Sequence, residues 1–250
     1  MSDRFYCPGP WSDGRAVLVG DEARHLARVR RVGVGARVAL FDGRGRSATA
    51  EVVEVGRDRV GLTILSEGPA GRALAGPLVL ATAVPKGERF DWLVEKATEL
   101  GVSRLVPILA ERSSVDPRGT KLDRLRRLVV EASKQSGRCR LMDIDEPTPL
   151  ADWLGSGGEG LGSRYIAHPG ASSIGAYPRP DLAGGIVVAV GPEGGFTDDE
   201  VDRATRSGYR TIGLGPTTLR VETAAVATCA AVLAGADAGS NPIGSRRDPV

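Results

Sequence analysis

Hydrophobic and polar residues alternate over the first part of the chain in the way that short β-strands require. Three segments, 36–43, 46–55 and 58–65, combine β-branched residues with partial alternation, and glycines separate them. A helical pattern at about 22–30 precedes these strands. The pattern predicts a small β-barrel domain over residues 1–70.

From residue 78 the pattern changes to apolar runs that alternate with helical periodicity. Strands that alternate with helices form mostly parallel sheets. The second part, 77–236, is therefore predicted to be an α/β domain. Segment 66–77, rich in Gly, Pro and Ala, is the predicted linker, and 237–250, without periodicity, is a predicted flexible tail. The predicted strands are 78–84, 104–109, 164–167, 186–190 and 210–214.

Helices are predicted at 88–100, at about 120–136 and at about 222–234. The first two place apolar residues on one face and end at a glycine. The third, "ETAAVATCAAVLA", is small and apolar nearly all round, so it should be buried. At the end of a domain, such a helix indicates close helix packing or a subunit interface.

Composition removes several classes of protein. In the 250 residues, no apolar stretch approaches a membrane span, and the N-terminus lacks the apolar core of a secretory signal. The three cysteines are scattered, which favours a reducing compartment, and we expect a cytoplasmic protein. With two histidines and no CxxC pair, we expect no metal centre.

The charge of the chain is unevenly distributed although its net value is only +2. Residues 24–46 carry seven Arg against one acid, and residues 118–140 carry eight Arg or Lys against two acids. Local basic segments suit a polyanion such as RNA. They are equally compatible with solvated helix faces.

The stretch "GPEGGFTDDE" follows the apolar run that ends at Val190. Thr197 and Glu200 have the spacing of a capping box, so a helix should begin there. Asp198 and Asp199 argue against a phosphate at this helix start, and neither a Rossmann fingerprint nor a P-loop is present. The glycines either let the backbone approach a flat, weakly charged ligand or serve the geometry of a tight turn.

A second glycine-bearing loop, "LGPTTLRVETA", follows the run 210–214. Together with "GPEGGF" it resembles the C-terminal signature of the SPOUT methyltransferases, and within them the RsmE family of ribosomal RNA small-subunit methyltransferases. The similarity covers roughly residues 16–234. Other pieces agree in order and spacing: "HLARVRRVGVGARVALFDGRG", "KGERFDWLVEKATELGV", "PILAERSSV", "EASKQSGR" and "AHPGAS".

The resemblance implies a fold and an activity that spacing does not show. It implies an α/β protein with an N-terminal PUA-like β-barrel and a C-terminal SPOUT domain that contains a trefoil knot. It further implies a homodimer that uses S-adenosylmethionine to methylate N3 of one uridine in 16S rRNA of the small ribosomal subunit.

The same resemblance, with the loop pattern, assigns candidate residues. For the methyl donor they are His168, Pro169, Gly191, Pro192, Gly194, Gly195, Leu214, Gly215 and Leu219. Arg220 is the candidate for stabilising the uracil anion or a phosphate, and Glu193 is the candidate proton acceptor. Arg28, Arg30, Arg31, Lys86, Arg89 and Arg112 are the candidates for the RNA backbone.

Each assignment has a structural alternative. His168 could be a structural histidine at the end of a strand, with its hydrogen bonds satisfied by the protein. Glu193 could be a solvated acid in a turn, and Arg220 could be an ion-pair partner of Glu222. The chain also departs from the family at Thr217, where arginine is frequent, and at Lys134, which stands in an acidic place. Two other functions remain open: a SPOUT enzyme that modifies another base or a ribose, and a non-catalytic RNA-binding protein.

Overall fold

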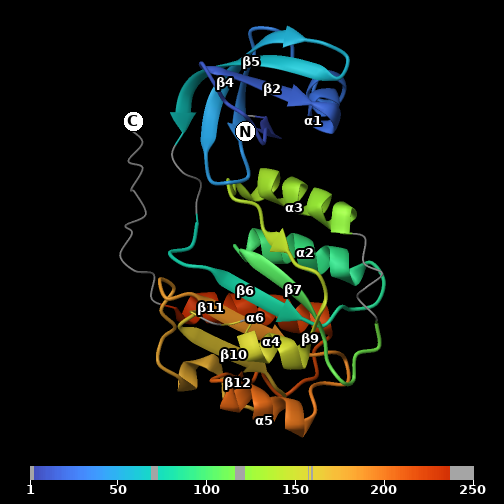
Figure 1. Ribbon diagram of the computed structural model, residues 1–250, viewed down its shortest axis with the longest axis vertical. Coiled ribbons are helices and arrows are strands. Elements are labelled where there is room, and N and C mark those ends of the chain that lie inside the picture. Colours follow the sequence, from blue (N-terminus) through green and yellow to red (C-terminus); the bar gives the residue numbers. More distant parts are fainter. Residues whose placement is uncertain (1–2, 69–72, 116–121, 157, 159, 237–250) are drawn as a thin grey trace. The chain divides into compact units, whose positions relative to one another are not determined.

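The computed structural model describes residues 3–68, 73–115, 122–156, 158 and 160–236 (Figure 1). By compactness the chain forms two units. The first unit comprises 1–73, 94–103 and 121–143, and the second comprises 74–93, 104–120 and 144–250. The N-terminal unit therefore includes later segments of the chain as well as the expected first 70 residues. The predicted tail, 237–250, lies outside the described residues.

The first unit is built on a five-stranded sheet. Three strands fall where alternation predicted them, namely β3 (Arg37–Phe41), β4 (Ser47–Val55) and β5 (Arg59–Gly68). Two short strands were not predicted, β1 (Arg4–Tyr6) and β2 (Arg15–Val19). The order is β1-β3-β4-β5-β2, and only the β1–β3 pair is parallel.

The predicted helix at 22–30 begins earlier and changes type along its length. It consists of α1 (Gly20–Arg24) followed by a π-helix, η1 (His25–Val29). The Arg30 N–H donates to the His25 carbonyl at 3.0 Å, five residues back. The helix predicted over 22–30 is therefore present, but its second half has the wider turn of a π-helix.

The helix α3 (Leu122–Ser136) belongs to the first unit and carries Lys134. Its ammonium group donates to Glu22 at 2.9 Å and to Glu131 at 3.0 Å, and only 9% of the side chain is exposed. The charge of Lys134, which departs from the family pattern, is therefore neutralised by two carboxylates of the protein. Burial of a lysine is tolerated when it is paired in this way.

The second unit contains a parallel sheet with the order β12-β10-β11-β6-β7-β8. Its main strands fall in the five predicted runs: β6 (Leu78–Thr82), β7 (Arg104–Leu109), β10 (Ser163–Ala167), β11 (Ile186–Val190) and β12 (Arg210–Ile212). Two short strands, β8 (Asp143–Ile144) and β9 (Thr148–Pro149), were not predicted. The central strands β6 and β11 are fully buried, as continuous apolar runs require.

Successive residues of these strands face opposite sides of the sheet. Val187 and Ala189 belong to a core shared with Trp153 of α4 (Leu150–Ser156) and Ala204 of α5 (Asp198–Arg206). The helix α6 (Val221–Gly235) lies along β11 and β6 (Figure 1). Because side chains alternate along a strand, α6 and the α4–α5 pair can each bury apolar residues of the same strands.

The helices confirm most of the periodicity. The predicted helix 88–100 is α2 (Arg89–Glu99), and the capping box at Thr197 begins α5. The helix α4 was not predicted, since it is short. α6 buries one face, including Ala225 and Cys229, while its other face is only half-buried. Burial raises the pKa of the Cys229 thiol to about 12, so this thiol is not a nucleophile at neutral pH. None of the described helices has the length and apolar character of a membrane span.

Candidate functional site

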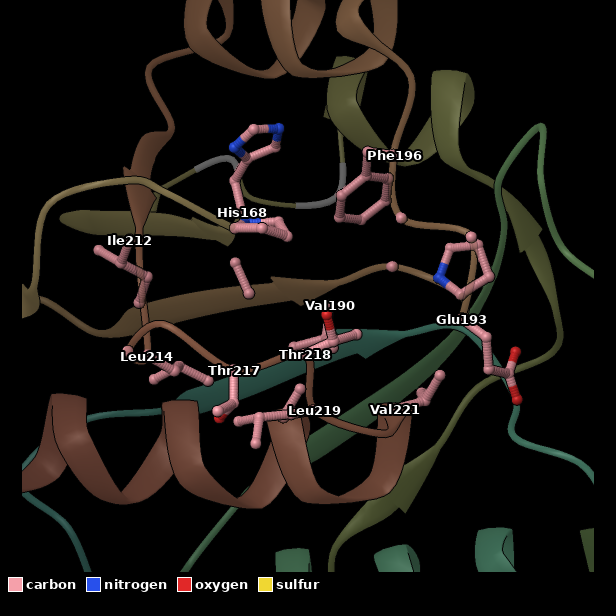
Figure 2. A pocket seen from close by; sticks show the side chains of 18 residues that line it. His168, Val190, Glu193, Phe196, Ile212, Leu214, Thr217, Thr218, Leu219 and Val221 are labelled. Carbon is pink, nitrogen blue, oxygen red and sulfur yellow. The ribbon is translucent and has the colours of Figure 1, made fainter.

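A cavity of about 310 Å³ lies at the carboxyl ends of β10, β11 and β12. Its walls are the residues directly after these strands and the first turn of α6 (Figure 2). All nine residues predicted to hold a methyl donor line it. Ligands of open α/β sheets bind outside the carboxyl ends of strands, so this cavity has the expected position.

The first wall is the turn 191–195, which we call the donor turn. The Gly195 N–H donates to the Pro192 carbonyl at 2.8 Å, and Gly195 has φ +70°. A Cβ on Gly191 would lie 3.1 Å from the Phe196 ring, whereas nothing lies within 4 Å of one on Gly195. Glycine is therefore required here by the turn itself: by packing at Gly191 and by backbone conformation at Gly195.

Directly after the donor turn, backbone N–H groups at the start of α5 donate hydrogen bonds to side chains. The Thr197 hydroxyl accepts from the Glu200 N–H at 3.3 Å, and the Glu200 carboxylate accepts from the Thr197 N–H at 2.9 Å. The other oxygen of Glu200 accepts from the Glu111 N–H at 2.8 Å. Glu200 is buried, so a single carboxylate fixes the start of α5 against the loop after β7.

The second wall is the loop 213–219, which we call the crossing loop. The Gly213 N–H donates to the Ser172 carbonyl at 2.9 Å, and the His168 N–H donates to the Ile212 carbonyl at 3.0 Å. A Cβ on Gly213 would stand 2.1 Å from the Ala171 carbonyl oxygen. The backbones of the two loops thus approach each other here to a distance that only glycine allows.

Beyond this crossing the loop is open to solvent. Gly215 has φ +116°, and nothing lies within 4 Å of a Cβ built there. Thr217, at the departure from the family pattern, is exposed and lines the cavity. Leu214 and Leu219 are half-buried and give this wall its apolar surface (Figure 2).

The two predicted catalytic residues are placed differently. Glu193 is exposed and lies at the rim of the cavity, with its carboxylate turned away from the apolar lining (Figure 2). Arg220 is exposed and is the N-cap residue of α6, but it does not line the cavity. His168 stands across the cavity from Leu214 and Leu219 (Figure 2).

The ion-pair partner of Glu222 is Arg89, not Arg220. Arg89 Nε lies 3.8 Å from Glu222 Oε1, and the Glu222 carboxylate is buried. Its other oxygen has no hydrogen-bond partner among the described residues. The alternative in which Arg220 pairs with Glu222 is therefore not what the structure contains. Arg89, a predicted RNA contact, therefore also has a protein partner.

The remaining predicted RNA contacts fall on both units. Arg28, Arg30 and Arg31 are exposed on the first unit, where Arg30 pairs with Asp3. On the second unit, Lys86 is exposed, and the guanidinium of Arg112 donates to the Gly194 carbonyl at 3.0 Å. Arg112 therefore contacts the donor turn directly.

Comparison with known proteins identifies the chain. A family described as "RNA methyltransferase domain" matches residues 73–233, and one described as "RNA methyltransferase PUA domain" matches residues 18–65. The Ribosomal RNA small subunit methyltransferase E of Bacillus subtilis is 30% identical over 86% of this chain and 88% of its own length. The Synechocystis protein of the same name is 32% identical over 85% and 70%. The chain belongs to the ribosomal RNA small subunit methyltransferase E family.

Solved structures of the family agree with this placement. A Ribosomal RNA small subunit methyltransferase E from Neisseria gonorrhoeae, bound to S-adenosyl methionine, is 30% identical with a TM-score of 0.85. A methyltransferase from Legionella pneumophila with bound cofactor SAM is 29% identical, also with a TM-score of 0.85. Each of these two matches covers 94% of this chain and 98% of the solved chain. The α/β fold with an N-terminal PUA-like domain is therefore that of the family.

Sequence reasoning missed two residues that shape the site, Gly213 and Phe196, and did not predict the contact made by a third, Arg112. Gly213, which allows the backbone crossing, was passed over in favour of Gly215. Phe196 packs on Gly191 and lines the cavity. Arg112 was assigned to RNA, although it holds the donor turn. The contacts of Gly213 and Arg112 have no local signal, because each joins segments far apart in the chain, whereas Phe196 packs on a residue of its own turn.

Proposed function

We propose that this chain transfers the methyl group of S-adenosylmethionine to N3 of one uridine in 16S rRNA of the small ribosomal subunit. Membership of the family supports the reaction and the substrate. The observation that carries the proposal is the cavity between the donor turn and the crossing loop, which gathers all nine residues assigned to the donor.

The residues around the cavity fit this donor. A volume of about 310 Å³ lies within the range of small-molecule sites, roughly 300–1,000 Å³. The lining is mainly apolar or glycine, and Glu193 is the only carboxylate among the lining residues of the described chain. Such a neutral site suits a ligand that is not strongly anionic. When bound, the donor supplies an electrophilic methyl group on sulfur.

The protein's part in the reaction is positioning and charge stabilisation. Uracil N3 must lose a proton before or during transfer, and negative charge then spreads to its two carbonyl oxygens. We assign stabilisation of that charge to Arg220, which is exposed next to the cavity wall formed by Leu219 and Val221. Glu193, at the rim, is the proposed acceptor of the proton, directly or through water.

Binding of the RNA backbone is assigned to exposed cations on each unit. Arg28, Arg30 and Arg31 serve on the first unit, and Lys86, Arg89 and Arg112 on the second. Arg30, Arg89 and Arg112 already have protein partners, so Arg28, Arg31 and Lys86 are the stronger candidates. Phosphate contacts should make the affinity for ribosomal particles fall steeply with salt.

The finer architecture belongs to the same proposal. A trefoil knot is supported by the close crossing at Gly213, where the loop after β12 passes the loop after β10. A homodimer is supported by the half-buried apolar face of α6. Residues 1–70 are proposed to act as an RNA-binding domain and 77–236 as the methyltransferase domain. A cytoplasmic location follows from the proposed ribosomal substrate.

The test uses small ribosomal subunits from a strain that lacks this gene. Purified protein and labelled S-adenosylmethionine are added, and reverse-transcription stops are mapped on the rRNA. Methylation at N3 blocks base pairing, so the proposal predicts label together with a new stop at one uridine. Label without a stop would assign the enzyme to a ribose or another edge of a base. Absence of label, with the donor bound, would contradict the proposed substrate.

A further inference from the structure

The loop after β7 carries an arginine that contacts the donor turn from outside the cavity. Residues 110–113 form a tight turn: the Ser113 N–H donates to the Ala110 carbonyl at 3.1 Å, and the Ser113 hydroxyl accepts from the Ala110 N–H at 3.0 Å. The Glu111 N–H is held by Glu200. The position of the Arg112 backbone is thus fixed on both sides.

From this fixed turn, Arg112 reaches Gly194 in two ways. Its guanidinium donates to the Gly194 carbonyl at 3.0 Å. Its aliphatic stem also packs on the Gly194 Cα, because a Cβ added at Gly194 would lie 3.2 Å from Arg112 Cβ and 3.4 Å from Arg112 Cδ. The glycine at 194 is therefore explained by Arg112, which occupies the space where a side chain would stand.

We propose that Arg112 is a positioning residue for the methyl donor, which holds the Gly194 peptide so that the donor turn keeps its binding geometry before RNA arrives. The inference rests on the proposed function, since it takes the cavity as the donor site. It differs from the assignment of Arg112 to RNA, because it predicts an effect on donor affinity when no RNA is present.

The Gly194 carbonyl belongs to the peptide that joins Gly194 and Gly195. Both residues line the cavity, and glycine has more backbone conformations open to it than any other residue. The hydrogen bond from the Arg112 guanidinium to the Gly194 carbonyl favours one orientation of this peptide over the others that two glycines allow. Preorganisation of this kind lowers the entropic cost of binding a ligand on the other side.

The experiment uses two variants of the full chain and one matched control. Arg112→Met keeps an unbranched side chain against Gly194 and removes the guanidinium. Arg112→Lys keeps the positive charge and a hydrogen-bond donor, but on a shorter side chain. Arg206→Met removes an exposed arginine of α5 that does not line the cavity. Calorimetric titration with S-adenosylmethionine, without RNA, gives the donor affinity of each protein.

The expected result is a dissociation constant about threefold to tenfold higher for Arg112→Met, a smaller rise for Arg112→Lys, and no change for Arg206→Met. Unchanged donor affinity in Arg112→Met, with weaker binding to ribosomal particles, would assign Arg112 to RNA alone and overturn the inference. If the unmodified protein itself binds no S-adenosylmethionine, the proposed function fails first.

A second readout does not depend on the donor. The Gly195 N–H is protected by its hydrogen bond to Pro192. Loss of the Arg112 contact should raise the hydrogen-exchange rate of the peptide that contains residues 191–196 several-fold, while the thermal midpoint stays unchanged. Exchange at the rate of the unmodified protein would contradict a positioning role even if no donor binding were measured.

Discussion

The two loops that enclose the cavity are built in opposite ways. The donor turn is held by its protein neighbours, since Phe196 packs on Gly191 and Arg112 binds the Gly194 carbonyl, while Glu200 fixes the start of α5 directly after it. The crossing loop is fixed at Gly213 and is then exposed from Gly215 to Thr218. The first loop is held by side chains at Gly191 and Gly194, whereas the second is exposed beyond Gly213. We therefore expect substitutions at the packed positions, Gly213 and Glu200, to change stability, and substitutions at the exposed residues, Arg220 and Glu193, to change turnover.

The largest expected effect is at the fixed point of the crossing loop. In Gly213→Ala, the new methyl group meets the Ala171 carbonyl, so one of the two backbones must move. We expect a loss of about 3 kcal/mol or more in the free energy of unfolding, with donor binding abolished. Urea unfolding and calorimetric titration measure the two effects.

The control for Gly213→Ala lies in α4. Gly155 is helical and exposed, and a Cβ there meets nothing within 4 Å. Gly155→Ala should raise stability by about 0.5–1 kcal/mol and leave donor binding intact. Equal stability of Gly213→Ala and the unmodified protein would show that the crossing is not tight.

The next effect is at the end of the crossing loop. Arg220 makes no side-chain cap of α6 and is exposed, so Arg220→Gln should fold normally and bind the donor as before. If it stabilises the uracil anion, kcat should fall about a hundredfold. Turnover on small subunits is compared with that of Arg206→Gln, and equal turnover of the two would remove Arg220 from the chemistry.

A similar loss of turnover is expected when Glu193, at the rim of the cavity, is changed, if its carboxylate accepts the proton. Glu193→Gln should lower kcat by about a hundredfold, the low end of general-base effects, because this carboxylate is exposed. The matched variant is Glu111→Gln, which changes an exposed carboxylate outside the cavity. Full turnover of Glu193→Gln across pH would mean that the proton leaves to water.

The smallest expected effect is at Glu200, which fixes the start of α5 directly after the donor turn. Both carboxylate oxygens of Glu200 accept backbone N–H groups, and Glu200→Gln replaces one acceptor by a donor. We expect a loss of about 1–3 kcal/mol in unfolding free energy, with weaker donor binding. Asp199→Asn, an exposed acid of the same helix turn, should change stability far less. A smaller loss for Glu200→Gln than for Asp199→Asn would contradict the bridging role.

Much of this site could be predicted from the sequence because it is local. Apolar runs gave the strands, the Thr197–Glu200 spacing gave the start of α5, and the glycine-bearing loops gave the cavity. The protein partners of the cations could not be predicted. Arg89 and Arg112, predicted by charge to bind RNA, each contact a protein group, and Lys134 pairs with Glu22. A sequence shows that a cation exists, but its partner depends on the fold.

Hydrogen exchange in the cavity walls, followed as S-adenosylmethionine is added to the protein without RNA, tests the donor site most directly. If the donor binds between the two loops, residues 191–196 should exchange slowly before addition and more slowly after it. Residues 214–219 should exchange fast before addition and be strongly protected after it. If neither peptide responds to saturating donor, the cavity between the two loops is not the donor site.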